Sequence, residues 1–283
     1  MPAVLGTNVA SLWASNNLQS AQSNMANSVE RLSSGLRINR ARDDAAGLGV
    51  ANALTQQING ANQGIKNLND GISIVQTAEG AIQAASDMAQ RIMALATQGA
   101  NGTLSTDGRT SIKNELVVLL ASIDKIKART MFNGITLLAA PTVTIASSNV
   151  VTDTIDISAG LLDISTGGST GASSAGTLNT KVTALVSTAG STWTDVMTAA
   201  SNYITALDTQ RGKLGALQNQ MDYSVVNITE LSSNLQSARS RVVDTDYASE
   251  TASLTKGQIL QQAATAMLAQ ANQMPNVILT LLK

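Results

Sequence analysis

The side chains that could perform acid–base, nucleophilic or metal chemistry are few in kind. The chain of 283 residues contains no histidine and no cysteine. The imidazole base of Ser-His-Asp enzymes, thiolate nucleophiles and metal sites built on Cys or His are therefore excluded. Asp, Glu, Lys and Ser remain, but their spacing is not typical of a catalytic site. We therefore predict that the protein is not an enzyme and uses no metal or cofactor.

Composition excludes two further classes of function. The net charge is −1 and only 13% of residues are charged, whereas a nucleic-acid-binding surface would need clustered Lys and Arg. No run of 18 apolar residues predicts a membrane span. The first residues also lack the basic and apolar regions of a secretory signal, so we expect export to use another route.

The spacing of proline and apolar residues predicts long helices. No proline lies between Pro2 and Pro141, and apolar residues recur in steps of three and four. One helix is expected from about 45 to 98, about 80 Å long, so the molecule should be elongated. The expected apolar stripes are Leu5, Val9, Leu12, Leu18, Ala21, Met25, Val29, Leu32 and Leu36; Leu54, Ile58, Ala61, Ile65, Leu68, Ile72, Val75, Ile82, Ala85, Ile92 and Leu95; Ile112, Leu116, Leu119, Ile123 and Ile126; Leu207, Leu214, Leu217, Met221, Val225, Ile228, Leu231, Leu235, Ala238 and Val242; and Leu260, Ala264, Met267, Ala271, Met274, Ile278 and Leu281.

The middle of the chain differs from both ends. Residues 142–146 and 150–157 are rich in Val, Ile and Thr and alternate in polarity, which predicts a β-hairpin. Residues 167–176 are mostly Gly, Ser and Ala, which indicates a surface loop. Thr106 or Asp107 is expected to cap the helix that begins there.

The two ends of the chain carry almost no charge. No charged side chain occurs in residues 1–29 or in residues 257–282, although both segments have an apolar stripe. A helix that faces water normally carries Lys and Glu on its outer side. Helices that pack against many copies of themselves avoid charges, because a buried unpaired charge is costly. The ends therefore indicate self-association.

Motifs near both ends resemble those of bacterial flagellin. The N-terminal matches are ERLSSGLRIN at 30–39 and DDAAG at 43–47, and the C-terminal matches lie at 237–242, 244–248, 258–263 and 269–273. The resemblance covers about residues 1–140 and 193–283. It implies a mainly α fold, a long rod of antiparallel helices with coiled-coil-like terminal helices, a small β-hairpin in the middle and no large outer domain.

The resemblance also implies a domain order and a function. The implied domains are the N-terminal D0 helix and turn (1–44), the N-terminal D1 helices (45–140), a short variable insert (141–192), the C-terminal D1 helix (193–249) and the C-terminal D0 helix (250–283). The implied function is a structural subunit that polymerises through its uncharged terminal helices into the extracellular flagellar filament used for motility. Its implied partners are further copies of itself, an export chaperone of the flagellar type III route, cap and hook-junction proteins, and Toll-like receptor 5.

Three sets of site residues accompany this interpretation. The expected polymerisation core is Leu5, Val9, Leu12, Leu18, Leu260, Met267, Ile278 and Leu281. Expected contacts of the turn between D0 and D1 are Arg37, Arg40, Arg42, Asp43 and Asp44, which a solvated charge cluster would equally explain. The residues implied for Toll-like receptor 5 are Gln90, Arg91, Leu95 and Glu115.

Two other functions stay open at this point. One is the hook–filament junction protein, a structural relative with similar terminal helices. The other is a surface adhesin that uses residues 141–192, although this segment has no aromatic residue and few charges. The Asn-x-Thr patterns at Asn101 and Asn227 are interpreted as chance matches to a glycosylation signal.

Overall fold

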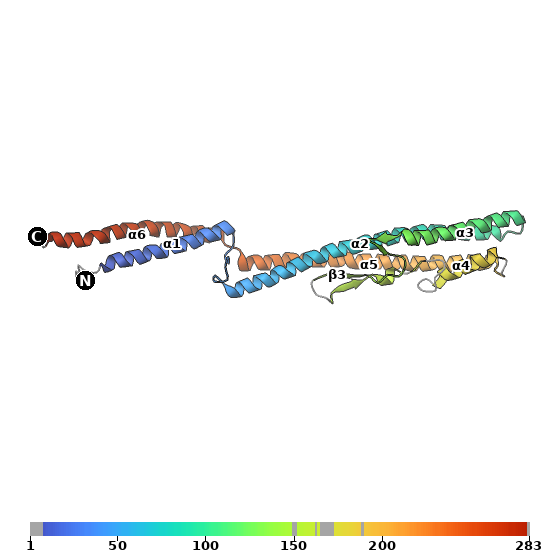
Figure 1. The fold of residues 1–283 in the computed structure, drawn as a ribbon, viewed down its shortest axis with the longest axis horizontal. Helices are drawn as coiled ribbons and strands as arrows, with labels where there is room; N and C mark the ends of the chain where they lie inside the picture. The colour runs from blue at the N-terminus through green and yellow to red at the C-terminus, as the bar shows by residue number, and fades with distance from the viewer. Residues whose placement is uncertain (1–7, 149–151, 162, 165–172, 188–189, 282–283) are drawn as a thin grey trace. The chain divides into compact units, whose positions relative to one another are not determined.

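The computed structural model describes residues 8–148, 152–161, 163–164, 173–187 and 190–281. This part of the chain is mainly helical and divides into two compact units (Figure 1). The terminal unit comprises Met1–Gln56 and Asn234–Lys283, and the middle unit comprises Gln57–Ser233. Two long helices contribute to both units, α2 (Ala45–Gly99) with 55 residues and α5 (Trp193–Val243) with 51 residues. The expected helix from about 45 to 98 is confirmed.

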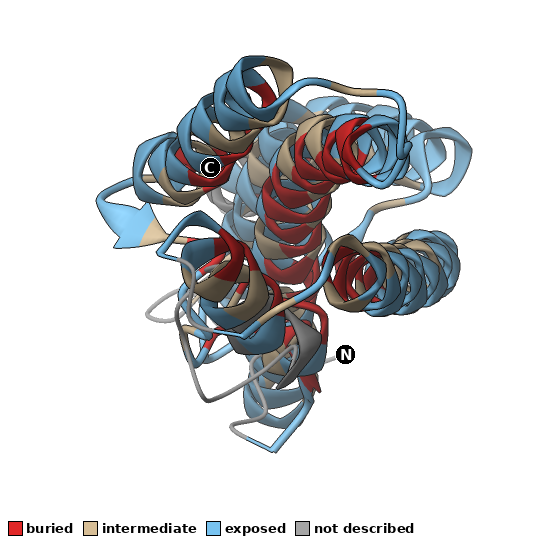
Figure 2. Ribbon diagram, turned by 90° about the vertical axis from the view of Figure 1, so that its right-hand side faces the viewer, coloured by how far each residue is buried: buried red, intermediate tan, exposed pale blue. Residues whose placement is uncertain are grey.

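The middle unit is built on the apolar stripes of three helices. Each helix buries one side and exposes the rest, as the burial colours show (Figure 2). The stripes of α2, α3 (Thr106–Arg129) and α5 meet in one core, which confirms the predicted spacing. Fully buried members of this core include Leu68, Ile82, Ile92, Leu116, Ile123, Leu207 and Leu214.

The start of α3 differs from the prediction by one residue. The Ser105 hydroxyl caps this helix, accepting a hydrogen bond of 3.2 Å from the Gly108 N–H. The expectation of Thr106 or Asp107 as the cap was therefore wrong. Both lie inside the first turn, where the negative charge of the Asp107 carboxylate interacts favourably with the positive end of the helix dipole.

Short strands and one further helix fill the connection between α3 and α5. Strands β1 (Met131–Phe132) and β2 (Ile135–Thr136) pair around an Asn133-Gly134 turn in which both residues have positive φ. Strands β3 (Thr144–Ala146) and β4 (Thr154–Asp156) form the predicted hairpin, with Ile145 opposite Ile155. A 3-10 turn, η1, follows at Ser158–Gly160. The hairpin is confirmed but is shorter than its sequence pattern.

The predicted loop over 167–176 is only partly tested. Helix α4 (Ser173–Val186) takes up its last four residues, so the loop prediction was wrong there. Residues 167–172 lie outside the described residues. Leu178, Val182 and Leu185 of α4 are buried in the core shared with α2, α3 and α5. The described part of the insert thus has no core of its own, and no large outer domain is present in it.

A backbone contact at Gly64 holds the β3–β4 hairpin against α2. A Cβ atom at this position would overlap the carbonyl oxygen of Ser147, so the hairpin backbone lies directly on the helix. Nearby, the Asn67 side-chain amide donates a hydrogen bond of 3.1 Å to the carbonyl of Ala146. Among the helices of the described residues, none is long and apolar enough to cross a membrane.

Two glycine substitutions in α2 should change stability in opposite directions. Gly64→Ala forces the hairpin away from the helix, and we expect a loss of about 1–3 kcal/mol in the free energy of unfolding. Gly80 has open space around its Cβ position, so Gly80→Ala should add about 0.5–1 kcal/mol through better helix propensity. Urea unfolding of both variants measures the difference. Equal effects of the two variants would contradict the contact at Gly64.

Candidate functional site

The terminal unit is organised by one pair of helices. Helix α1 (Val9–Ser34) lies beside α6 (Tyr247–Leu281), as Figure 1 shows. Helix α1 begins after Asn8, whose side chain accepts a hydrogen bond from the Ser11 N–H. It ends at Gly35, where a φ of 72° reverses the chain direction at no steric cost.

Small side chains form the contact between α1 and α6. The most buried residues of α1 are Ala14, Ala21 and Ser28, each seven residues apart. On α6 the covered positions recur with the same period, and they include Gly257 and Ala271. Such small residues let two helices approach closely. A Cβ atom added to Gly257 would already lie within van der Waals contact of Met25.

Neutral polar groups connect the same two helices near their far ends. The Asn8 side-chain amide donates a hydrogen bond of 2.8 Å to the Ala271 carbonyl. The Ser11 hydroxyl donates one of 3.0 Å to the side-chain oxygen of Asn272. At the other end of the pair, Arg31 and Glu250 form an ion pair of 3.7 Å. Among the described residues, the charged side chains of this pair thus lie toward the end where α1 finishes and α6 begins.

The largest apolar side chains of this unit lie outside the helix contact. Val9, Leu12 and Trp13 of α1 are more than half exposed, and so is Met267 of α6. Leu260 is 47% exposed. Of the predicted stripe residues, Ala21, Ala264 and Ala271 are covered, whereas Val9, Leu12, Leu260 and Met267 are exposed, because the helices pack on Ala, Ser and Gly positions. The role of these four residues in polymerisation stays a prediction.

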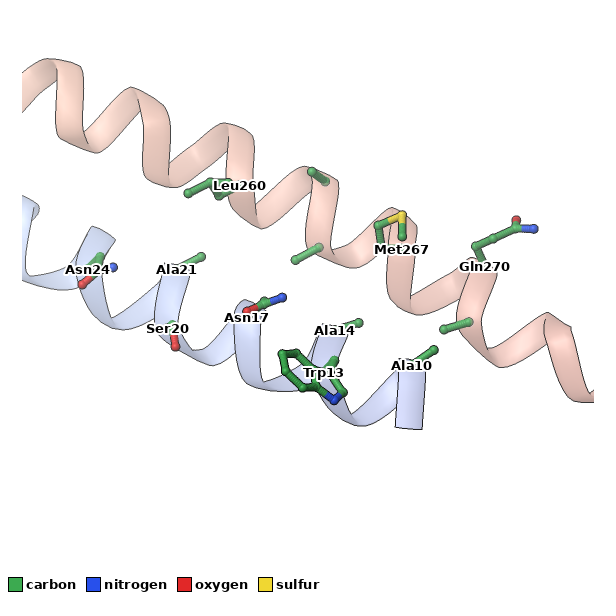
Figure 3. A pocket seen from close by; sticks show the side chains of 13 residues that line it. Ala10, Trp13, Ala14, Asn17, Ser20, Ala21, Asn24, Leu260, Met267 and Gln270 are labelled. Atoms are coloured by element: carbon green, nitrogen blue, oxygen red, sulfur yellow. The ribbon is translucent and has the colours of Figure 1, made fainter. Parts of the chain in front are cut away.

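A groove runs along the α1–α6 pair. It has a volume of about 700 Å³, and Figure 3 shows its side chains along the strip between the two helices. Alanines form much of its lining, with Trp13, Leu260 and Met267 as its large apolar members. The lining comprises Ala10, Trp13, Ala14, Asn17, Ser20, Ala21, Asn24, Leu260, Ala263, Ala264, Met267, Gln270 and Ala271. It contains no charged side chain.

The predicted polymerisation residues fall into four groups. Leu260 and Met267 line the groove, and Val9 and Leu12 are exposed on α1 without lining it. Leu18 is half-buried. Leu5 lies outside the described residues. Ile278 and Leu281 belong to α6, but their side chains are outside the described part of the chain. Trp13 was missed by the prediction, because the stripe was continued from Val9 to Leu12, three residues on, and not to Trp13, four residues on.

Backbone hydrogen bonds join the turn after α1 to the end of α5. The Arg37 N–H donates to the Val243 carbonyl at 2.6 Å, and its guanidinium donates to the Val242 carbonyl at 2.6 Å. The Thr245 N–H donates to the Gly35 carbonyl at 3.0 Å. The segment that connects α1 to α2 and the segment that connects α5 to α6 are therefore joined by a short antiparallel bridge.

The acidic residues of this turn each have a local structural role. Asp43 accepts hydrogen bonds from the backbone N–H groups of Arg40 and Asn39, at 2.9 and 3.2 Å. The Arg40 N–H bond, helped by that of Asn39 and by the Arg42 charge, lowers the pKa of Asp43 below its ordinary value of 3.8. Asp44 caps α2 by accepting a hydrogen bond of 2.8 Å from the Gly47 N–H.

The five predicted turn residues therefore do not form one cluster. Arg40, Arg42 and Asp43 are brought together, whereas Arg37 bonds to α5 and Asp44 caps α2. Sequence reasoning missed Glu30, which pairs with Arg40 at 2.8 Å. The signal was present, because Glu30 is the first charged residue of the chain.

The residues implied for an innate receptor lie in the middle unit. Arg91 and Glu115 form an exposed ion pair of 2.9 Å between α2 and α3, and Gln90 is exposed beside them. Leu95 is only 2% exposed and packs in the core. Leu95 therefore offers almost no surface of its own in this unit, and the receptor contacts of the four residues stay a prediction.

The fold and the groove define a class of protein in which the two chain ends form an uncharged, incompletely covered helix pair. Comparison with known proteins gives the family. Residues 5–142 match the bacterial flagellin N-terminal helical region, and residues 197–282 match the bacterial flagellin C-terminal helical region. The flagellar filament 33 kDa core protein of Treponema phagedenis is 37% identical over 99% of this chain and 100% of its own length. The flagellin of Halalkalibacterium halodurans is 37% identical over 90% of each chain.

The chain belongs to the bacterial flagellin family. It is a structural subunit of the flagellar filament that serves motility, and not an enzyme. A further relative, flagellin FlaB2 of Treponema pallidum, is 36% identical over 99% of this chain and 100% of its own length. Membership of this family confirms the resemblance that the two terminal motifs indicated.

The order of the turn should depend on the ionisation of Asp43. Because its folded pKa is lowered, the carboxylate stabilises the turn above the unfolded value of 3.8, and this contribution is lost as the pH falls through the folded pKa. We expect the amides of Asn39 and Arg40 to be protected from hydrogen exchange at neutral pH and to lose protection in acid. Asp43→Asn should remove the protection at both pH values. Retained protection in this variant would show that the carboxylate does not hold the turn.

Proposed function

We propose that the chain polymerises by burying the exposed apolar side chains of α1 and α6 against neighbouring copies. The observation that carries this proposal is the mismatch between the two sides of the helix pair. Within one chain the contact uses Ala, Ser and Gly, while Trp13, Leu260 and Met267 remain largely exposed. Large exposed apolar groups that are contiguous typically mark an interaction surface.

The energy available from this surface is sufficient for assembly. Burying one large aliphatic side chain contributes about 1.5–3 kcal/mol, and each copy offers several. A pre-formed α1–α6 pair also lowers the ordering cost at the moment of binding. Apart from its alanines, the remaining lining consists of hydroxyls and amides, such as Ser20 and Asn17. These groups can hydrogen-bond across an interface without placing a charge inside it.

The charged turn at 37–44 would then mark the boundary of the polymerising segment. Its carboxylates and guanidinium groups satisfy each other and the backbone locally, through Asp43, Asp44 and Arg37. Contacts of Arg40 or Arg42 with a neighbouring copy are compatible with their exposure. We infer that the turn sets the direction in which α2 continues, while the assembly energy comes from α1 and α6.

Truncating the exposed groove residues should block assembly while leaving the monomer intact. Trp13→Ala and Leu260→Ala remove side chains that are already largely exposed, so monomer stability should change by less than about 0.5 kcal/mol. Because each 1.4 kcal/mol is a factor of about ten, the concentration needed for elongation should rise at least about tenfold. Heat-dissociated protein is incubated with short filament seeds, and elongation is followed by electron microscopy and sedimentation.

A matched variant controls for general effects on α1. Gln22 is exposed and does not line the groove, so Gln22→Ala should elongate seeds like the parent chain. Unchanged elongation by both Trp13→Ala and Leu260→Ala would sink the assignment of this groove. A parent chain that never elongates seeds would instead favour the hook–filament junction role.

The proposed accessory partners follow from the same surface. We infer that an export chaperone covers the uncharged C-terminal segment before assembly, because its apolar side chains have no partner until then. Export as an unfolded chain through the flagellar type III channel suits a sequence without cysteine, since no disulfide must be broken or remade. Cap and hook-junction proteins would meet the same helix pair at the two ends of the filament.

A second proposed function is recognition of the released monomer by Toll-like receptor 5. The supporting observation is the exposed Arg91–Glu115 pair beside Gln90, which presents a guanidinium on a rigid helix. Arg is favoured at binding hot spots because its planar group donates in two directions. Leu95 contributes only by packing beneath this surface.

Receptor recognition predicts a selective effect of Arg91. Arg91→Ala should lower the potency of dissociated monomer at least about tenfold in cells that report Toll-like receptor 5 activation. Lys125→Ala removes another exposed cation, on α3 but outside this pair, and should leave the potency unchanged. Equal potency of both variants and the parent chain would remove Arg91 from the receptor surface.

A further inference from the structure

The turn between α2 and α3 carries chemistry that filament assembly does not use. It contains the sequence Asn101-Gly102-Thr103, exposed at the surface of the middle unit. We propose that this turn is a site of intramolecular deamidation, in which the backbone nitrogen of Gly102 attacks the side-chain carbon Cγ of Asn101. The product is a carboxylate at position 101 beside Arg109. The proposal is independent of how the chain polymerises.

The side chain of Asn101 is held as an activated electrophile. Its oxygen Oδ1 accepts a hydrogen bond of 3.1 Å from the Thr103 N–H and one of 3.0 Å from the Thr103 hydroxyl. Two donors on one carbonyl oxygen stabilise the negative charge that develops there when a nucleophile adds to the carbon. The ring closed by the Thr103 N–H bond also contains all five atoms of the succinimide that would form.

The nucleophile is unobstructed. Glycine has no side chain to shield its nitrogen, and no atom lies within 4 Å of the Cβ position at Gly102. Within the described chain, no backbone acceptor is recorded for the Gly102 N–H. This N–H can therefore lose its proton to water or hydroxide without first breaking an internal hydrogen bond.

A cation increases the acidity of this N–H. The backbone carbonyl of Asn101, which forms the peptide bond to Gly102, accepts hydrogen bonds from the Arg109 guanidinium at 3.2 Å and from the Leu104 N–H at 3.3 Å. Drawing electron density toward this oxygen stabilises the deprotonated amide. Charge-assisted hydrogen bonds are stronger than neutral ones, so Arg109 should contribute more than Leu104.

The reaction balances without any cofactor. The deprotonated Gly102 nitrogen forms a bond to Cγ of Asn101, and the carbonyl electron pair moves to Oδ1. The Cγ–Nδ2 bond then breaks, and nitrogen leaves as ammonia after taking a proton from water. Water next opens the succinimide at either carbonyl, which gives aspartate or isoaspartate. Nothing is oxidised or reduced.

The surroundings favour the charged product. The Nε atom of Arg109 is buried and has no hydrogen-bond partner within the described residues. A carboxylate formed at position 101 would offer this guanidinium a negative charge and a second acceptor oxygen, where the neutral amide has one uncharged oxygen that Thr103 already occupies. Pairing a buried donor removes a cost of desolvation. The reaction therefore changes an uncharged turn into an ion-paired one.

Two other Asn-Gly pairs in the chain serve as internal comparisons. Asn59-Gly60 lies inside α2, where the helix fixes the Gly60 backbone. Asn133-Gly134 forms the β1–β2 turn, and in the described chain no donor to its side-chain oxygen and no cation on its carbonyl is recorded. If local sequence alone controlled the reaction, Asn101 and Asn133 would react equally fast.

The test is peptide mapping of the full chain by mass spectrometry during incubation at mildly alkaline pH. Each Asn-Gly pair is scored for the mass change of amide to acid and for isoaspartate. We expect Asn101 to react first, and faster in the folded chain than in the same chain unfolded in urea. Thr103→Val, which removes the hydroxyl donor, and Arg109→Leu should each slow the reaction about threefold to tenfold.

Conservative variants distinguish the loss of a hydrogen-bond donor from a general disturbance of the turn. Thr103→Ser and Arg109→Lys keep a donor and should retain most of the rate, and circular dichroism checks that every variant is folded. The proposal is overturned if Asn101 reacts no faster than Asn133, or faster in urea than in the folded chain. It is also overturned if Asn101 carries a sugar in protein from its native source, because a substituted amide cannot leave as ammonia.

Discussion

Pairing of α1 with α6 through small side chains is the constraint on which the rest of the terminal unit depends. Ala14, Ala21 and Gly257 allow the two helix backbones to approach closely. A helix has only one inward side, so the larger side chains of the same stripe must lie elsewhere. Trp13, Leu260 and Met267 are left toward solvent as a consequence. The α1–α6 pair is thereby held together by its smallest apolar side chains, and its largest ones remain exposed.

The middle unit differs from the terminal unit in where its large apolar residues lie. Its large apolar residues are inside, where α2, α3, α5 and the insert share one core. The insert adds no separate domain in its described part. Instead, the hairpin backbone lies against α2 at Gly64, and α4 packs its apolar side on the same core. Tyr203 illustrates how completely this core is closed, since its hydroxyl is buried and donates to the Ile164 carbonyl at 2.8 Å.

Sequence patterns predicted helix length and period well, because both depend on local spacing. The bounds of α2 and the buried positions Ile58, Leu68 and Ile92 follow from steps of three and four. Which side of a helix faces its partner was less predictable where the helix has two apolar sides. Whether Leu260 or Gly257 of α6 is covered depends on how closely α1 approaches. Helix α4 was missed because Gly and Ser dominate the composition at its start. The burial of Leu95 agrees with its place in this stripe of three- and four-residue steps, whereas the resemblance to receptor-recognised flagellins implied a surface contact at the same residue.

Charge placement completes the physical account of assembly. A carboxylate or guanidinium inside a repeated interface would recur in every copy, and each unpaired one would cost several kcal/mol. The chain avoids this cost by carrying no charged side chain before Glu30 or between Lys256 and Lys283. Where charges do occur at the base of the helix pair, they are already matched within the chain, as in Arg31 with Glu250 and Arg40 with Glu30. Under the proposed mode of assembly, apolar burial would drive association, and neutral amides and hydroxyls that need partners of matching geometry would give it specificity.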